Sequence, residues 1–349
     1  MEQIKEKTFW SIVGVALFAG IVAGLQVGKV PPALTVLRKE LGINLVTAGW
    51  VASIFNGCSA LLGVITGLIT DRMSARPIIC LCTIFLGLGS LIGGIAPSVA
   101  ILFFGRLIEG LGFVGIVVAA PAIITAASHT KDRALALSIW GIYMPAGMAV
   151  AMATAPFLLG RFGWRGMWLL NAAVIFIFLI ALVWIMAPQR WSDPTGGSGR
   201  QRSWEDVRQT LSFAGPWVLG GCFTLYSLQY LAVITWLPTF LIESLGKTSE
   251  KAALITAAVI FVNIFGNLSV AWLIQRGYER WFLIAFAYTV MALAAVGIFS
   301  RAVSDSFKVP LAFIFSMFGG LLPTAVLASA PRHSPSSEQL CRGARLRPM

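Results

Sequence analysis

The sequence predicts an all-α integral membrane protein, and two observations carry this prediction. Of the 349 residues, 58% are hydrophobic and only 11% are charged, and the mean hydropathy is +0.84. A soluble globular domain has about one quarter charged residues. In addition, apolar runs long enough to cross a bilayer as helices recur along the chain.

Ten such runs are expected to form transmembrane helices. The first is too long for a signal-peptide core and is followed by many others, so it is interpreted as a helix. The runs predict an N-terminal six-helix half (1–186), a cytoplasmic linker (187–213), a C-terminal half with four helices (214–330) and a polar tail (331–349). The expected helices are 9–36, 44–70, 77–97, 98–128, 134–160, 164–186, 215–242, 249–275, 281–300 and 309–330.

The predicted linker contains PTGGSGRQR, a composition typical of flexible segments. Ser203 and Asp206 have the spacing of a helix N-cap box, and apolar residues follow at helical spacing. A short helix on the membrane surface fits this pattern. An ordinary solvated loop fits it equally well.

The distribution of basic residues predicts the orientation in the membrane. With the N-terminus inside, the inner segments hold sixteen Lys and Arg residues and the outer loops hold eight. The positive-inside rule therefore predicts that both termini lie in the cytoplasm. The expected location is a bacterial-type inner (plasma) membrane, which the protein crosses several times. The same distribution explains the net charge of +12 without a nucleic-acid partner.

Enzyme and metal chemistry are not expected. No pair of the five cysteines has metal-ligand spacing, and both histidines lie in polar stretches. No catalytic triad, phosphate-binding loop or dinucleotide-binding pattern stands out. The expectation is a protein without catalytic residues, metal or cofactor.

Two charged residues interrupt the apolar stretch LFFGRLIEGLG (102–112). A charge at the centre of a membrane helix costs about 2.5–3.5 kcal/mol on insertion scales, so it must face protein or water. Arg106 and Glu109 are three residues apart and share a helix face. Gly110 and Gly112 are predicted to let another helix pack closely.

An internal repeat is visible in the sequence. GLITDRMSAR (67–76) matches AWLIQRGYER (271–280), so that Asp71, Arg72 and Arg76 each have a counterpart 204 residues later. The same offset carries the fourth predicted helix onto the tenth. Two similar halves are a feature of transporters.

These motifs resemble the signatures of the major facilitator superfamily. Gly67, Asp71, Arg72 and Arg76 match its loop signature after the second helix, whereas Ser74 and Ala75 stand where a glycine and a basic residue are usual. LFFGRLIEGLG is similar to the superfamily pattern L-x-x-x-R-x-x-Q-G-x-G, with Glu109 where glutamine is common. Within the superfamily, GKVPPAL, SIWGIYMPAG, GWRGMW and GGLLP resemble the branch that contains cyanate and nitroimidazole transporters.

The resemblance implies a major facilitator-type helical bundle with two pseudo-symmetric halves, here with about ten of the usual twelve helices. After APRHSPSSEQL the chain reads CRGARLRPM, which is unlike an eleventh helix. One hypothesis is that the reading frame is truncated or shifted near Leu340. In the superfamily the loop signature packs against helix 11, so this partner of Asp71 and Arg72 is expected to be missing.

The resemblance also implies that helices 1, 4, 7 and 10 line a central cavity. Lys29 and Arg106 are then expected to flank it at similar depth, with Glu109 one turn deeper. Helix 10 is uncharged at the equivalent positions, so the charge chemistry is assigned to the first half. Further candidate substrate- or proton-binding residues in the second half are Tyr226, Gln229, Tyr230 and Trp236 on helix 7, and Asn263 and Asn267 on helix 8.

Each candidate has a purely structural alternative. For Arg106 and Glu109, the alternative is that they pair only with each other and brace helix packing. For Lys29, the alternative is that its side chain extends to the outer interface. The helix 7 aromatic residues equally fit a packed core, and the two asparagines fit contacts between helices. For the proposed gating loop of Gly67, Asp71, Arg72 and Arg76, the alternative is a plain positive-inside anchor.

The predicted function is secondary active transport by alternating access, with proton-coupled uptake of a small anion. Protonation of Glu109 would free Arg106 to bind the anion. The predicted partners are a small anionic substrate, protons and the lipid bilayer, and the protein is expected to act as a monomer. Two alternatives stay open. One is a proton-antiport exporter of a small organic compound, which is disfavoured because the antiporter signature of helix 5 in the superfamily, G-x-x-x-G-P, is not clearly present in WGIYMPAG. The other is a truncated membrane protein that does not transport.

Overall fold

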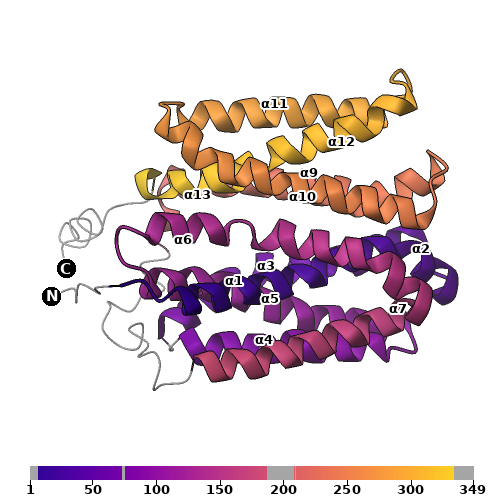
Figure 1. The fold of residues 1–349 in the computed structure, drawn as a ribbon, viewed down its shortest axis with the longest axis horizontal. Helices are drawn as coiled ribbons and strands as arrows, with labels where there is room; N and C mark the ends of the chain where they lie inside the picture. The colour runs from indigo at the N-terminus through magenta and orange to yellow at the C-terminus, as the bar shows by residue number, and fades with distance from the viewer. Residues whose placement is uncertain (1–6, 73–74, 187–207, 209, 334–349) are drawn as a thin grey trace. The chain divides into compact units, whose positions relative to one another are not determined.

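The computed structural model describes residues 7–72, 75–186, 208 and 210–333, and every regular element among them is a helix (Figure 1). Within these residues nine helical spans are long and apolar enough to cross a membrane. The sequence predicted ten. The difference arises because the predicted helices 134–160 and 164–186 join in one span, Leu135–Ile185.

The first predicted helix is two helices, α1 (Trp10–Gly28) and α2 (Val30–Leu41), which meet at Lys29. Pro31 and Pro32 follow directly after this junction. Proline has no N–H to donate, and it is tolerated in the first turn of a helix, where this donor is not needed. The break therefore has a local cause, and it fixes the position of Lys29 inside the bundle.

Three helices follow: α3 (Leu45–Arg72), α4 (Ala75–Gly94) and α5 (Val99–Ala127). α4 and α5 approach so closely that a Cβ atom on Gly105 would lie 2.8 Å from the carbonyl oxygen of Gly89. A Cβ on Gly112 would lie 2.5 Å from the carbonyl oxygen of Cys82. The predicted packing role of Gly112 is confirmed, because only a residue without a side chain fits there.

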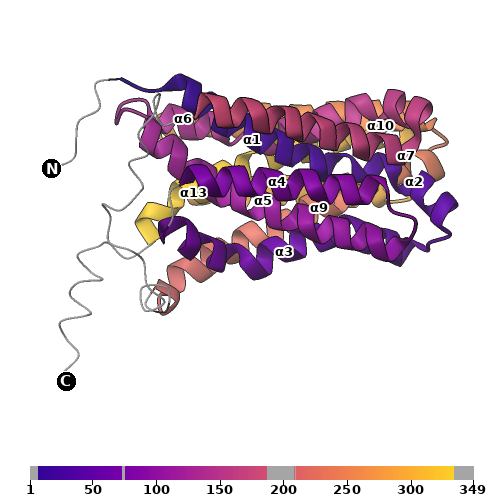
Figure 2. The same cartoon turned by 90° about the horizontal axis from the view of Figure 1, so that it is seen from below.

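After the short α6 (Arg133–Trp140), α7 (Tyr143–Ile185) covers both the fifth and sixth predicted helices. Gly163 has a φ of 66°, a left-handed conformation that glycine adopts readily, and the chain turns there. The part before the turn packs on α1, where Gly147 meets Gly24. The part after the turn packs on α4, so α4 lies alongside both α5 and α7 (Figure 2).

The rest of the described chain forms α9 (Ala214–Glu243), α10 (Ser249–Gln275), α11 (Arg280–Phe299), α12 (Asp305–Gly319) and α13 (Leu321–His333). The tenth predicted helix, 309–330, is thus α12 and α13, which meet at Gly320. α11 packs on both of them.

The helices group into two compact units. The first unit comprises Met1–Gly199 and Ile234–Phe261, and the second comprises Arg200–Val233 and Val262–Met349. The predicted boundaries of the sequence halves remain a prediction. The predicted cap at Ser203 and Asp206, and the tail that ends in CRGARLRPM, lie outside the described residues.

Candidate functional site

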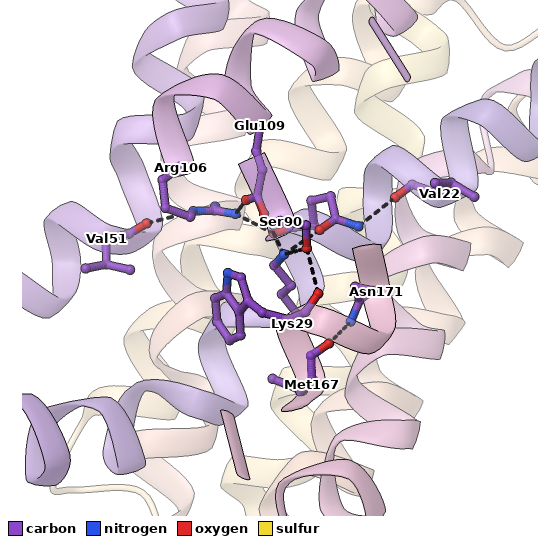
Figure 3. Close-up of polar contacts among 10 residues, drawn as sticks. Val22, Lys29, Val51, Ser90, Arg106, Glu109, Met167 and Asn171 are labelled. Carbon is purple, nitrogen blue, oxygen red and sulfur yellow. Dashed lines mark hydrogen bonds and ion pairs between the residues drawn. The ribbon is translucent and has the colours of Figure 1, made fainter. Parts of the chain in front are cut away.

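Three buried ionisable residues meet in the first unit; we call Lys29, Arg106 and Glu109 the charged cluster (Figure 3). Arg106 and Glu109 lie one turn apart on α5, and Lys29 sits at the break between α1 and α2. Lys29 Nζ lies 2.6 Å from Glu109 Oε1, and Arg106 pairs with Glu109 Oε2. The side chains are 0%, 1% and 0% exposed for Lys29, Arg106 and Glu109. One carboxylate therefore bridges two cations away from the surface.

The ammonium group of Lys29 is fully hydrogen-bonded. It donates to Gln26 Oε1 at 2.5 Å, to Ser90 Oγ at 2.8 Å and to Glu109 Oε1 at 2.6 Å. A lysine has three N–H donors and no acceptor, so these three contacts use all of them. Two of the acceptors are neutral, and only Glu109 compensates the charge.

Arg106 connects three helices through its guanidinium group. Its Nε donates to the carbonyl oxygen of Val51 on α3 at 3.1 Å, and its NH1 donates to the carbonyl oxygen of Gln26 on α1 at 2.9 Å. The same NH1 donates to Glu109 Oε2. Because the donors of arginine are fixed in a plane, these contacts hold the guanidinium in one orientation.

Aromatic rings lie against both cations. Lys29 Nζ is 4.6 Å from the ring centroid of Trp168 on α7, and the Arg106 guanidinium is 4.5 Å from that of Phe55 on α3. Ser90 also donates to the carbonyl oxygen of Trp168 at 2.9 Å. Such cation–π contacts are worth more where the cation is desolvated, as both are here.

The charged cluster carries a net charge of +1, because two cations share one carboxylate. The alternative in which Lys29 extends to the interface is wrong, since its side chain is buried. The Arg106–Glu109 pair exists, but it includes Lys29 as a third member. A buried excess charge in a membrane protein is costly and marks a candidate functional site.

Three of the six candidates predicted in the second half form an uncharged group in the second unit, together with two residues that were not predicted, Ser316 and Thr324. We call Tyr230, Asn263, Asn267, Ser316 and Thr324 the neutral cluster. Asn263 Nδ2 donates to the carbonyl oxygen of Ser316 at 2.8 Å, and Asn267 Nδ2 donates to Asn263 Oδ1 at 2.7 Å. The hydroxyl groups close the network: Thr324 donates to Asn267 at 3.0 Å, and Tyr230 lies 3.3 Å from Ser316 Oγ.

The other candidates on α9 are divided between the two units. Tyr226 is buried and stacks on Tyr230, with 5.5 Å between the ring centroids, whereas Gln229 is half-buried. Trp236 belongs to the first unit, where it packs against a core that includes Val30 and Trp168. The candidates therefore do not form a single cluster.

The predicted gating loop is mostly helical. Gly67, Asp71 and Arg72 belong to α3, which ends at Arg72, and Arg76 is in the first turn of α4. Gly67 and Arg76 are half-buried, and the side chains of Asp71 and Arg72 lie outside the described part. The gating role stays a prediction.

Four side chains that contact the charged cluster were missed by the sequence interpretation: Gln26, Phe55, Ser90 and Trp168. Gln26 had a usable signal, because it is a polar residue in an apolar helix, one turn before Lys29. Ser90 and Trp168 had none, since they reach the cluster only through the packing of α4 and α7 on α1. No group of three His, Cys, Asp or Glu residues that suits a metal ion occurs within the described ranges.

Comparison with known proteins agrees with this architecture. The chain is 24% identical over 93% of its length to the probable sulfoacetate transporter SauU of Cupriavidus necator, covering 80% of that protein. It is 22% identical over 93% of its length to the putative niacin/nicotinamide transporter NiaP of Bacillus subtilis, covering 81% of it.

A solved structure shares the fold. It is the crystal structure of a bacterial homologue of the human lysosomal transporter Spinster in an inward-facing, unoccupied conformation, with a TM-score of 0.74 and 16% identity. The match covers 97% of this chain and 78% of that one. The sequence profile of the Major Facilitator Superfamily matches residues 16–339. This chain therefore belongs to the major facilitator superfamily, and it is a multi-pass membrane transporter and not an enzyme.

Proposed function

We propose that this protein is a secondary active transporter that takes up a small anion together with protons by alternating access. The observation that carries the proposal is the charged cluster, in which two buried cations share one carboxylate. The proposal includes an inner (plasma) membrane location with both termini in the cytoplasm, action as a monomer, and a place near the cyanate and nitroimidazole branch.

The net charge of the cluster favours an anion as the substrate. Buried cations without a partner are strongly destabilising, because the protein interior screens charge much less than water does. An anion that reaches Lys29 and Arg106 therefore gains a larger Coulomb energy than it would at an exposed site. The names of two relatives are consistent with this, since sulfoacetate and niacin both carry acidic groups.

Proton coupling follows from the position of Glu109 between the two cations. While Glu109 is ionised, it occupies the donors that an anion needs. When Glu109 is protonated, the cluster has a charge of +2, and binding of a monovalent anion restores +1. The proton and the anion each make the other less costly to bind, which is the reciprocal coupling that symport requires.

Uptake into proteoliposomes tests this function, with labelled sulfoacetate and niacin as the first probes. We expect accumulation when the outside is more acidic than the inside, and none without a pH gradient. Arg106→Met should abolish uptake. Glu109→Gln should let the anion equilibrate but should not allow accumulation, because no proton is carried at this position.

Glu250→Gln is the matched control, because Glu250 is an exposed carboxylate in the first turn of α10. It should accumulate the anion as the wild type does. Accumulation by Glu109→Gln at the wild-type level would refute the proton route. Uptake unaffected by Arg106→Met would refute the anion site.

A further inference from the structure

The way in which Glu109 is held suggests what the substrate must present. The two oxygens of its carboxylate are used separately: Oε1 accepts from Lys29 and Oε2 accepts from Arg106. The two cations thus converge on two oxygens that share one carbon. When Glu109 no longer bridges them, one N–H of each cation points at this place.

Other donors of both cations are held by neighbouring groups, which restrains the direction of the two freed N–H groups. Gln26 and Ser90 keep the other two donors of Lys29. The carbonyl oxygens of Val51 and Gln26 keep Nε and the second N–H of the Arg106 NH1 group. A lysine on a flexible stem would adapt to many anions, but this one is restrained from two sides.

We propose that the substrate binds through an oxoanion head, a carboxylate or a sulfonate, whose two oxygens on one atom replace those of Glu109 between Lys29 and Arg106. This inference rests on the proposed function and narrows its substrate class. A halide offers a single centre to both donors. A linear anion has its two terminal atoms on opposite sides of the central atom, so they do not match two oxygens that lie on the same side of one carbon.

The surroundings of the site favour an organic oxoanion over an inorganic one. Trp168 and Phe55 lie against the two cations. The organic part of a substrate whose oxoanion head binds there would therefore start next to aromatic side chains. On the side of α4, a Cβ on Gly89 would lie 2.7 Å from Glu109 Cγ, so the helix backbone closes that direction. The head is therefore tightly confined.

Chemical rescue of the full chain tests the head group. In Glu109→Ala the bridging carboxylate is absent, and sodium acetate and sodium methanesulfonate should each restore thermal stability. We expect each to raise the thermal midpoint by a few degrees more than sodium chloride or sodium thiocyanate at equal ionic strength, since a ligand that binds only the folded state stabilises it. Glu250→Ala supplies the bulk effect of each salt, which is subtracted.

Three further samples keep the test decisive. Glu109→Gln preserves the side-chain volume and should show the same selectivity if the alanine variant does not fold. The wild type should gain the same selectivity as the pH is lowered, and Lys29→Gln combined with Glu109→Ala should lose it. Equal stabilisation by all four salts, or by none in any of these proteins, would overturn the inference.

The outcome is separable from that of the transport proposal. Proton-driven uptake of labelled sulfoacetate by the wild type is measured in the same preparation. Uptake without selective rescue refutes only the two-oxygen head group. Selective rescue without a response to the pH gradient refutes symport and leaves the head-group assignment in place.

Discussion

The two units each bury a polar cluster at a break in a helix, but only one of the clusters is charged. The charged cluster includes Lys29, between α1 and α2, and the neutral cluster includes Ser316, four residues before Gly320, where α12 meets α13. The offset of 204 residues places Phe313 where the first unit has Glu109. Each unit has a broken helix, but the offset does not relate the two breaks, because α9 (the counterpart of α1) and α5 (the counterpart of α12) are continuous. The buried charge is confined to one of the two units, so it is not a feature that the repeated fold itself requires.

The largest expected difference between the two units is the loss of stability when the residue at the Glu109 position is replaced. Glu109→Gln leaves two uncompensated cations, and it should lower the free energy of unfolding by about 3–5 kcal/mol, the range for breaking a buried ion pair. Phe313, which is half-buried on α12, is the counterpart of Glu109 in the second unit. Phe313→Gln should lower the free energy of unfolding much less, because it leaves no charge behind. Denaturation of both variants in detergent, followed by near-UV circular dichroism, measures the two costs.

Arg106→Met is the matched variant within the charged cluster. It leaves the Lys29–Glu109 pair electrically neutral, so its loss of stability should be smaller than that of Glu109→Gln even though more hydrogen bonds are removed. If Arg106→Met proved the more destabilising of the two, packing would outweigh charge in this cluster.

The second expected effect is a loss of stability when a glycine at a close helix contact is replaced, and it should be similar in the two units because both contain such contacts. Alanine at Gly112 would place its Cβ 2.5 Å from the carbonyl oxygen of Cys82, and at Gly266 it would place it 2.0 Å from that of Met317. Overpacking against backbone costs about 1–3 kcal/mol. Both variants should lower the thermal midpoint by a similar amount. Gly14→Ala is the control, because nothing lies within 4 Å of its Cβ position.

The third effect belongs to the neutral cluster. Asn263→Ala removes a donor from the carbonyl oxygen of Ser316 and an acceptor from Asn267, and should cost about 1–3 kcal/mol. It should leave anion uptake coupled to the pH gradient, since it changes no charge. Loss of uptake in a variant that stays folded would show that the neutral cluster contacts the substrate.

Sequence reasoning predicted the class of fold and part of the site, and the reasons differ between residues. Arg106 and Glu109 were identifiable because charge in an apolar helix is rare. Lys29 was a candidate for the same reason, but its contact with Glu109 depends on the break before Pro31, which periodicity does not reveal. The break at Gly320 was missed for the same reason, because apolar composition continues through it.

The grouping of the second-half candidates was the least predictable part. Tyr230 and Trp236 lie on one helix, α9, yet they pack in different units. Helical spacing indicates which residues share a face, but it does not show what that face contacts along its length. Ser90 is the extreme case, since a single serine in an apolar helix is usually bonded to its own backbone.

The smallest expected effect tests whether Ser90 restrains Lys29. Ser90→Ala removes one of the three acceptors of the ammonium group and a hydrogen bond to Trp168, and should cost about 1 kcal/mol. Ser269→Ala in the second unit removes only a bond to its own helix, to Gly266, and should be close to neutral. The more telling readout is anion selectivity, because a freed ammonium group adapts to more anions. Ser90→Ala in the Glu109→Ala background should narrow the difference in thermal midpoint between acetate and chloride, whereas Ser269→Ala in that background should leave it unchanged. An undiminished difference in the Ser90 variant would mean that Gln26 alone orients Lys29.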